Sequence, residues 1–235
     1  MIEYDKNKPL FSLHIPKCAG TSFSNVIKRW FHLGYIRHYY NRKLDKDPVV
    51  STRYKMVKKF LPVCVHGHFN EKKNLGVFDY YPDASQFITV VRDPLELQIS
   101  LFNYVATNFK NGSLYRKGKK VENWNGEINN FINNSNSPIL NHIPFTFSIN
   151  NLADVIESNF VFISSLENLH RNMAELSTVL SKPMVKPPHI NKSEFKYYPE
   201  EETINNFKER HEMEFALYEY IVQKERVKQS GKNSH

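Results

Sequence analysis

The sequence predicts a three-layer α/β fold, with a mostly parallel central sheet between two layers of helices. Short apolar runs typical of buried strands alternate with segments in which apolar residues recur at helical spacing. Polar residues follow directly after several of these runs, and ligands of parallel sheets bind where strands end. With 235 residues, 40% of them hydrophobic, the chain can bury one sizeable core. We therefore expect a single domain over residues 1–235.

The expected elements follow from these patterns in chain order. A buried strand over 10–15 leads through a Lys-bearing turn into a helix over 22–32. Further on we expect a helix over 49–61, a strand over 63–65, a strand over 86–91, a helix over about 95–108, a short helix within 129–141, a helix over 151–157, a strand over 160–163, a helix over 166–180 and a long helix from 199 to about 227. The region of about 111–149 is a polar insertion, and about 228–235 is a solvated tail.

Charge and cysteine content restrict the partners and the compartment. The formal net charge of +8 predicts anionic partners, which include nucleotides, acidic glycans, nucleic acid and anionic membranes. The two cysteines, Cys18 and Cys64, form no disulfide framework, which favours a reducing compartment. The N-terminal residues contain no apolar run of signal or transmembrane length. We expect no transmembrane segment, and a cytoplasmic or membrane-peripheral protein or a soluble catalytic fragment.

The stretch FSLHIPKCAGT at 11–21 places a lysine and a glycine between a strand and a helix. The first N–H groups of a helix lack intrahelical acceptors, the helix dipole is positive there, and Gly20 lets an anion approach the main chain. In a Walker A loop the lysine follows the second glycine, whereas Lys17 precedes Gly20. The stretch therefore predicts a phosphate or sulfate site other than an ordinary ATP loop. The alternative is that Thr21 or Ser22 caps the helix and Lys17 is solvated.

Two further polar groups follow predicted strands. The first is His66-Gly-His68, and the second is Arg92, with Ser100 about two helical turns later. Arg92 and Ser100 can reach one phosphate if the chain folds back over it. The alternatives are that Arg92 pairs locally with Asp93 and that the histidines only close a turn. Because the carboxyl ends of parallel strands meet, we expect these groups to gather at one edge of the sheet.

Taken in order, the motifs HIPK-x-x-GTSF, HGHF and VVRDP-x-E-x-x-x-S resemble the sulfotransferase superfamily, and most of all the glycan 2-O-sulfotransferases and their bacterial relatives. The resemblance is specific over residues 11–104 and looser over 160–167 and 189–220. It implies a fold like that of the P-loop-containing nucleotide hydrolases. It also implies 3'-phosphoadenosine 5'-phosphosulfate (PAPS) as the sulfuryl donor, with adenosine 3',5'-bisphosphate (PAP) as the product, and no metal ion.

The resemblance also implies roles for particular residues. The cradle of the 5'-phosphosulfate is formed by Lys17, Cys18, Ala19, Gly20, Thr21 and Ser22, and the 3'-phosphate is held by Arg92 and Ser100. His68 matches the proposed catalytic base, and His66 is a supporting or alternative base. A basic loop closes over the nucleotide in relatives, and here it corresponds to Lys192 and Ser193. This chain has Leu97 where family members often have an arginine after Glu96, so that arginine's role is absent or relocated.

The chemistry of sulfuryl transfer agrees with these residue types. A sugar hydroxyl attacks sulfur in line while a phosphate oxygen leaves, which requires a base, donors aimed at the leaving oxygen, and tight positioning. Histidine, with an ordinary pKa near 6.5, suits the base, and Lys17 suits the bridging oxygen. His66 and His68 have no carboxylate or cysteine at ligand spacing, so we expect no metal site.

The acceptor is expected to be a hydroxyl compound, most plausibly a carbohydrate. The basic run at 115–120 predicts contacts from Arg116, Lys117 and Lys119 to an acceptor that is anionic, unless the run is simply solvated. Tyr39, Tyr40 and Trp124 can stack on sugar or adenine, or belong to the core.

Two other functions compete with sulfuryl transfer. A P-loop nucleoside or sugar kinase would share the layered scaffold, but it needs Mg²⁺ and an acidic residue to hold it, and neither a Walker loop nor such a residue is recognisable. A basic polyanion-binding module is permitted by the charge. It is disfavoured because the basic residues are scattered and no nucleic-acid motif is present, so we expect no specific nucleic-acid partner.

Overall fold

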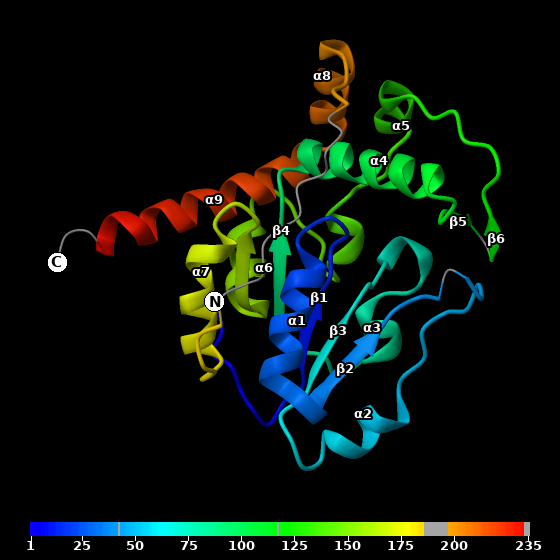
Figure 1. Cartoon of the computed structure of the whole chain (residues 1–235). Helices are drawn as coiled ribbons and strands as arrows, with labels where there is room; N and C mark the ends of the chain where they lie inside the picture. The colour runs from blue at the N-terminus through cyan, green and yellow to red at the C-terminus, as the bar shows by residue number, and fades with distance from the viewer. Residues whose placement is uncertain (42, 117, 186–196, 233–235) are drawn as a thin grey trace.

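Five parallel strands form the central sheet (Figure 1). The computed structural model describes residues 1–41, 43–116, 118–185 and 197–232. The strands are β1 (Leu10–Leu13), β2 (Tyr35–His38), β3 (Cys64–Gly67), β4 (Phe87–Val91) and β7 (Phe160–Ser165), and their order in the sheet is β2-β3-β1-β4-β7. This arrangement confirms the predicted α/β class.

Helices connect the strands, as parallel pairing requires. The α-helices are α1 (Gly20–Phe31), α2 (Thr52–Val57), α3 (Val77–Tyr80), α4 (Pro94–Lys110), α5 (Ile128–Asn133), α6 (Leu152–Asn159), α7 (Leu169–Val179), α8 (Glu201–Arg210) and α9 (Glu212–Lys232). Short 3₁₀ turns, η1 to η3, cover His32–Gly34, Glu71–Lys73 and Leu140–His142. A small hairpin of β5 (Tyr115–Arg116) and β6 (Lys119–Lys120) lies in the polar insertion.

The central strands are covered on both faces. Every residue of β1, β3, β4 and β7 is buried, although successive side chains of a strand point to opposite faces. Such continuous burial is typical of parallel sheets with helices on both sides. Helix α1 contacts β2 and β3, while α7 and α9 contact β7. The apolar face predicted for the first helix is buried as expected, with Phe23, Val26, Ile27 and Trp30 in the core.

The structure corrects the sequence prediction in several places: helix α3 and the β5–β6 hairpin were not predicted, α9 continues to Lys232 into the predicted tail, and three further differences follow. The edge strand β2 was not predicted, because four residues carry too little pattern. The helix predicted over 49–61 covers only Thr52–Val57, and Phe60 beyond it is 83% exposed. The long C-terminal helix is divided at His211 into α8 and α9. Both halves contact α4, but α8 also contacts α5, whereas α9 also contacts β7.

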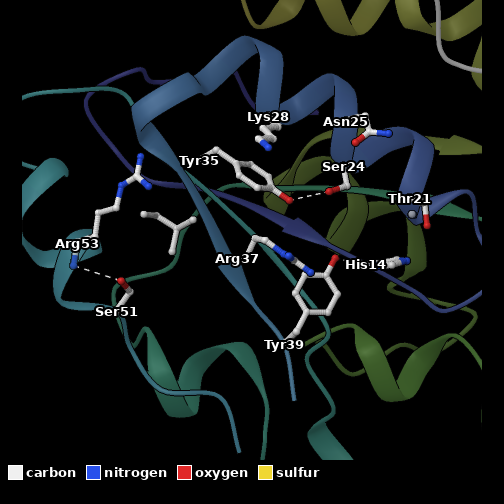
Figure 2. A pocket seen from close by; sticks show the side chains of 12 residues that line it. His14, Thr21, Ser24, Asn25, Lys28, Tyr35, Arg37, Tyr39, Ser51 and Arg53 are labelled. Atoms are coloured by element: carbon white, nitrogen blue, oxygen red, sulfur yellow. Dashed lines mark hydrogen bonds between the residues drawn. The ribbon is translucent and has the colours of Figure 1, made fainter. Parts of the chain in front are cut away.

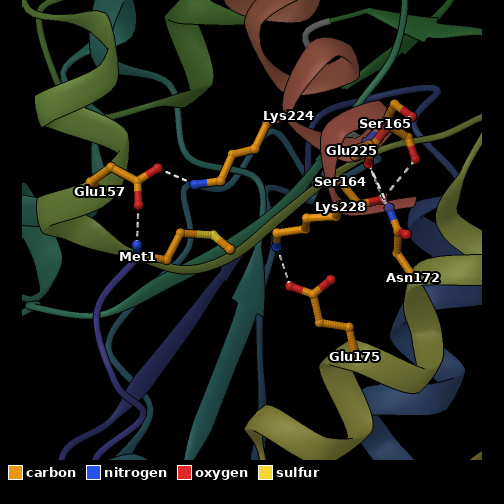
Figure 3. A network of polar contacts seen from close by, with 9 residues as sticks. All are labelled: Met1, Glu157, Ser164, Ser165, Asn172, Glu175, Lys224, Glu225 and Lys228. Carbon is orange, nitrogen blue, oxygen red and sulfur yellow. Dashed lines mark hydrogen bonds and ion pairs between the residues drawn. The ribbon is translucent and has the colours of Figure 1, made fainter. Parts of the chain in front are cut away.

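A buried carboxylate joins α9 to the end of β7 (Figure 3). Glu225 accepts hydrogen bonds from the hydroxyls of Ser164 and Ser165, the backbone N–H of Ser165, and the side-chain amides of Asn168 and Asn172, at 2.6–2.9 Å. These donors replace the water that the carboxylate loses on burial. The network therefore fixes the segment that follows β7 at the carboxyl edge of the sheet.

An ionic contact also holds the N-terminal residue, Met1, against α6. Glu157 on α6 pairs with both the N-terminal amine of Met1 and Lys224 of α9, and Lys228 pairs with Glu175 nearby (Figure 3). Cys18 and Cys64 are buried free thiols. Among the helices that the structure describes, none combines the length and the apolar character needed to cross a membrane.

Candidate functional site

The polar segments predicted to converge leave the same edge of the sheet. Leu13 of β1 is in register with Gly67 of β3 on one side and with Thr89 of β4 on the other. The next residue, His14, continues the β1–β3 ladder by donating its N–H to the Gly67 carbonyl at 2.8 Å. The loop that follows β1, the histidine that follows β3 and the arginine that follows β4 therefore lie side by side.

The loop after β1 has a backbone suited to anions. Lys17 and Ala19 adopt left-handed conformations, with φ of 65° and 54°, on either side of the buried Cys18. Successive residues of alternating hand turn backbone N–H groups toward one concave point. Helix α1 begins at Gly20 with Ala19 as its N-cap, and no side-chain hydrogen bond caps it. The alternative that Thr21 or Ser22 caps this helix is therefore wrong, because both lie within its first turn.

Lys17 is held close to a second cation. Its ammonium lies 4.7 Å from the centroid of the Tyr104 ring on α4. Burial, and next the positive charge of Arg92, lower the pKa of Lys17 below its ordinary value. Ser100 precedes Tyr104 by one turn, so both belong to the same face of α4. An anion between Lys17 and Arg92 would relieve the repulsion between these charges, and Ser100 lies on the helix face beside them.

Arg92 and Asp93 do not form the local pair considered as an alternative. The Arg92 guanidinium donates to Glu96 at 3.2 Å. Asp93 instead caps α4, since its Oδ1 accepts the Glu96 N–H at 2.9 Å, and Pro94 occupies the first helical position. Arg92 is thus fixed at the start of α4, with 22% of its side chain exposed.

The two predicted histidines differ in orientation and burial. The Nδ1–H of His68 donates to the carbonyl of His14 at 2.7 Å, so the neutral ring carries its lone pair on Nε2. His66 is fully buried and its Nδ1 lies 2.8 Å from the Ser12 hydroxyl. Burial, with a smaller contribution from His68, lowers the pKa of His66 to about 3. Of the two rings, only that of His68 is partly accessible.

His14 is a site residue that the sequence analysis missed. Its ring stacks on His68 at 4.1 Å between centroids and at an angle of 23°. Its Nδ1 lies 2.8 Å from the Tyr39 hydroxyl, and its carbonyl holds His68. Burial above all, and then His68, lower the pKa of His14 far below its ordinary value, so this ring is neutral. The sequence analysis placed His14 inside the strand predicted over 10–15, whereas β1 ends at Leu13 and leaves His14 at the carboxyl edge of the sheet.

Replacing Gly20 with alanine is expected to displace His14. A Cβ atom at Gly20 would lie 1.5 Å from Nε2 of His14, well inside contact distance. Overpacking of this kind costs about 1–3 kcal/mol, and here it would also shift the ring that stacks on His68. Thermal unfolding should show a lowered Tm. The double variant His14→Ala with Gly20→Ala removes the overlapping ring and should regain part of the lost Tm. If the loss of Tm in the double variant equals the sum of the losses in the two single variants, the contact is contradicted.

Two cavities flank the histidines. The first, which we call the basic cavity, has a volume of about 580 Å³ and is lined by His14, Gly20, Thr21, Ser24, Asn25, Lys28, Tyr35, Ile36, Arg37, Tyr39, Ser51 and Arg53 (Figure 2). The second, the amide-rich cavity, has a volume of about 800 Å³. Five asparagines line it, namely Asn70, Asn130, Asn134, Asn136 and Asn141, together with Trp124, Gln98 and His142 among others. His68 lines neither cavity, but its ring centroid lies 4.1 Å from that of His14 in the wall of the first and 6.3 Å from that of His142 in the wall of the second.

The remaining predicted contacts are distributed unevenly. Arg116 lines the amide-rich cavity, whereas Lys119 is exposed on β6 and lines neither cavity. Lys117, Lys192 and Ser193 lie outside the described residues. Trp124 packs against Phe102 and lines the amide-rich cavity, so it serves the core and the cavity together. Within the described ranges, no three His, Cys, Asp or Glu residues are placed to hold a metal ion.

Fold and site together define a parallel α/β protein with a lysine-bearing loop, a histidine and an arginine at the carboxyl edge of its sheet. No protein-family model matches the sequence, and no curated protein matches it. Among solved structures, the chain is similar to mouse sulfotransferase SULT7A1 complexed with PAP, with 14% sequence identity and a TM-score of 0.46. The likeness covers 80% of this chain and 62% of that one, so the chain spans less than two thirds of its neighbour.

Proposed function

We propose that the protein is a sulfotransferase that moves a sulfuryl group from PAPS to a hydroxyl, with a carbohydrate as the acceptor. The observation that carries the proposal is the meeting of Lys17, in its left-handed loop before α1, with His68 and Arg92 at one edge of the sheet. Two cations and a helix N-terminus suit the two phosphate groups of the donor, and a neutral imidazole suits a base.

On the donor side, the loop after β1 and helix α4 each bind one of the two anionic ends of PAPS. The ammonium of Lys17 and the first N–H groups of α1 are placed for the 5'-phosphosulfate. Arg92 at the start of α4 and Ser100 on the adjoining helix face are placed for the 3'-phosphate. Ionised phosphates would stabilise the charged form of Lys17, whose pKa is depressed by burial and by Arg92.

On the acceptor side, the amide-rich cavity suits a carbohydrate. Asparagine side chains offer both donors and acceptors, which match the hydroxyls of a sugar, and Trp124 offers an apolar ring. The side-chain oxygens of Asn70 and Gln98 are buried without a hydrogen-bond partner in the described structure. Such groups are costly unless a ligand or water satisfies them, and both belong to residues that line this cavity.

The transfer step requires one proton movement and one exchange of bonds at sulfur. The acceptor oxygen forms a bond to sulfur while the bond between sulfur and the phosphate oxygen breaks, which yields the sulfate ester and PAP. The hydroxyl proton passes to Nε2 of His68, whose Nδ1–H remains bonded to the His14 carbonyl. The Lys17 ammonium compensates the charge that develops on the leaving oxygen.

The proposal is tested by donor specificity. PAP should raise the melting temperature in a concentration-dependent manner, and a labelled sulfuryl group should pass from PAPS to members of a glycan panel in the presence of EDTA. Transfer from ATP that requires Mg²⁺ would instead identify a kinase. If PAP does not stabilise the protein, and generic polyanions bind only at low salt, the protein is a polyanion-binding module and the proposal is wrong.

A further inference from the structure

Two segments of the chain meet at the amino edge of the sheet, where the parallel strands begin. One is the end of α1 with η1, which leads into β2, and the other is α2 with the turn that leads into β3. The Arg53 side chain of α2 donates to the Leu33 carbonyl of η1 at 2.7 Å. A Cβ atom at Gly34 would lie 2.0 Å from the Pro62 carbonyl, so the two turns touch. Figure 1 shows α2 at this edge and α4 beyond the opposite edge, which carries the proposed site.

The surface formed by these segments, which we call the amino-edge patch, consists of exposed apolar and basic side chains. Its apolar members are Leu33, Met56, Phe60 and Leu61, and its basic members are Lys55, Lys58 and Lys59. Phe60 is 83% exposed and Leu33 is 65% exposed. Met56 follows Arg53 by three residues, so both belong to the face of α2 next to η1. An isolated exposed apolar residue is ordinary, whereas several on one surface mark an interaction site.

The amino-edge patch carries an excess of positive charge. The sequence has no aspartate or glutamate over 6–44 or over 48–70, the two stretches that form the patch. Asp83 in the loop before β4 pairs with Lys58 at 3.9 Å, but its side chain is largely exposed, and such pairs contribute little. The other two lysines form no ion pair with a carboxylate that the structure describes. The charge complement of this surface is therefore anionic.

An anionic membrane surface matches this combination of side chains. In segments that lie at a membrane interface, lysines contact the anionic headgroups while Phe and Leu side chains enter the acyl boundary. A protein partner needs a surface of complementary shape, and the apolar members of the patch line neither the basic nor the amide-rich cavity. A second copy of the chain, seated patch to patch, would bring like charges together. A bilayer imposes neither condition.

We infer that the amino-edge patch docks the protein on membrane surfaces that contain anionic phospholipids. Phe60 and Leu33 enter the boundary between headgroups and acyl chains, and the lysines contact the lipid phosphates. Because the patch lies at the amino edge of the sheet, docking leaves the carboxyl edge, with Lys17 and Arg92, open to the solution. The inference does not depend on sulfuryl transfer, since no member of the patch belongs to the proposed donor or acceptor sites.

Co-sedimentation of the full chain with vesicles tests this surface. Vesicles of phosphatidylcholine alone are compared with vesicles of phosphatidylcholine and phosphatidylserine in equal amounts. We expect the anionic vesicles to bind about tenfold more tightly or better, and this binding to weaken as the salt concentration rises. Phe60→Ser should weaken it about tenfold, because the burial of an aromatic ring is lost. The double variant Lys55→Gln with Lys59→Gln should weaken it about thirtyfold, because two basic side chains leave the anionic surface.

Matched control variants lie outside the patch. Ile149→Ser replaces an apolar residue that is 65% exposed, and Lys119→Gln with Lys120→Gln replaces two exposed lysines of β6. Every substituted side chain is exposed, so all variants should keep the parent Tm. Equal binding to the two kinds of vesicle, or equal losses in the control and patch variants, would overturn the inference. Self-association without vesicles that Phe60→Ser abolishes would also overturn it, because the patch would then be an interface between copies of the chain.

Discussion

Replacing Lys17 with alanine is expected to lower the rate of sulfuryl transfer on the order of a hundredfold or more, the usual loss when a donor to a developing oxyanion is removed. Lys17 lies in the loop at the start of α1 and faces the charge of Arg92. Alanine keeps a Cβ at a position with φ of 65°, so the backbone cost is unchanged. The measurement is kcat for transfer from PAPS, together with the affinity for PAP.

The same substitution should make the unliganded protein more stable. The pKa of Lys17 is lower in the folded state than its ordinary value, so the charged form is disfavoured by folding. This unfavourable contribution to the free energy of folding is present at pH values below about 10.4, the pKa of lysine in the unfolded chain. It is therefore present at neutral pH. A raised Tm with lost activity therefore distinguishes a binding residue from a structural one. Lys8→Ala, at the other end of β1, is the control and should change neither quantity; an equal loss of rate there would refute the assignment.

Most of the sheet could be predicted from the sequence because its strands are buried on both faces. Continuous apolar runs such as 86–91 cannot be mistaken for solvated loops, and the predicted strand differs from β4 by one residue. The edge strand β2 was missed since its four residues carry little pattern, and its burial depends on pairing with β3, which follows only after helix α2. The break at His211 was missed for a related reason. Helical spacing continues through it, and the difference lies in the further contacts, which α8 makes to α5 and α9 makes to β7.

The site residues that follow directly after a strand could be predicted from the sequence, and the other site residues could not. Lys17, His68 and Arg92 stand at strand ends, so their meeting follows from parallel pairing. The basic cavity depends instead on how α2 and β2 approach α1. Lys28, Arg37 and Arg53 each resemble an ordinary surface cation in the sequence, and nothing in their spacing indicates a common hollow. The basic run at 115–120 was more conspicuous, yet only Arg116 of its described cations reaches a cavity.

Replacing His68 with alanine is expected to reduce kcat by about 10²–10⁴-fold, the usual contribution of a general base. The Nδ1–H bond to the His14 carbonyl leaves the lone pair on Nε2, the state that accepts a proton. Because His68 is assigned to the acceptor's proton and not to the nucleotide, the affinity for PAP should be preserved. The activity of the parent protein should fall at low pH as the base becomes protonated, and the residual activity of the variant should lose that dependence.

The variant His66→Ala separates the two candidate bases. His66 is fully buried with its Nδ1 at the Ser12 hydroxyl, and its pKa of about 3 keeps it neutral under ordinary conditions. Its removal leaves a cavity in the core, so the main effect should be a lowered Tm, and the low-pH fall in activity should persist. His170→Ala, on the exposed face of α7, controls for loss of an imidazole. Should His66→Ala, and not His68→Ala, abolish the pH dependence of kcat, the base is His66 and protons must reach it through the His14 stack.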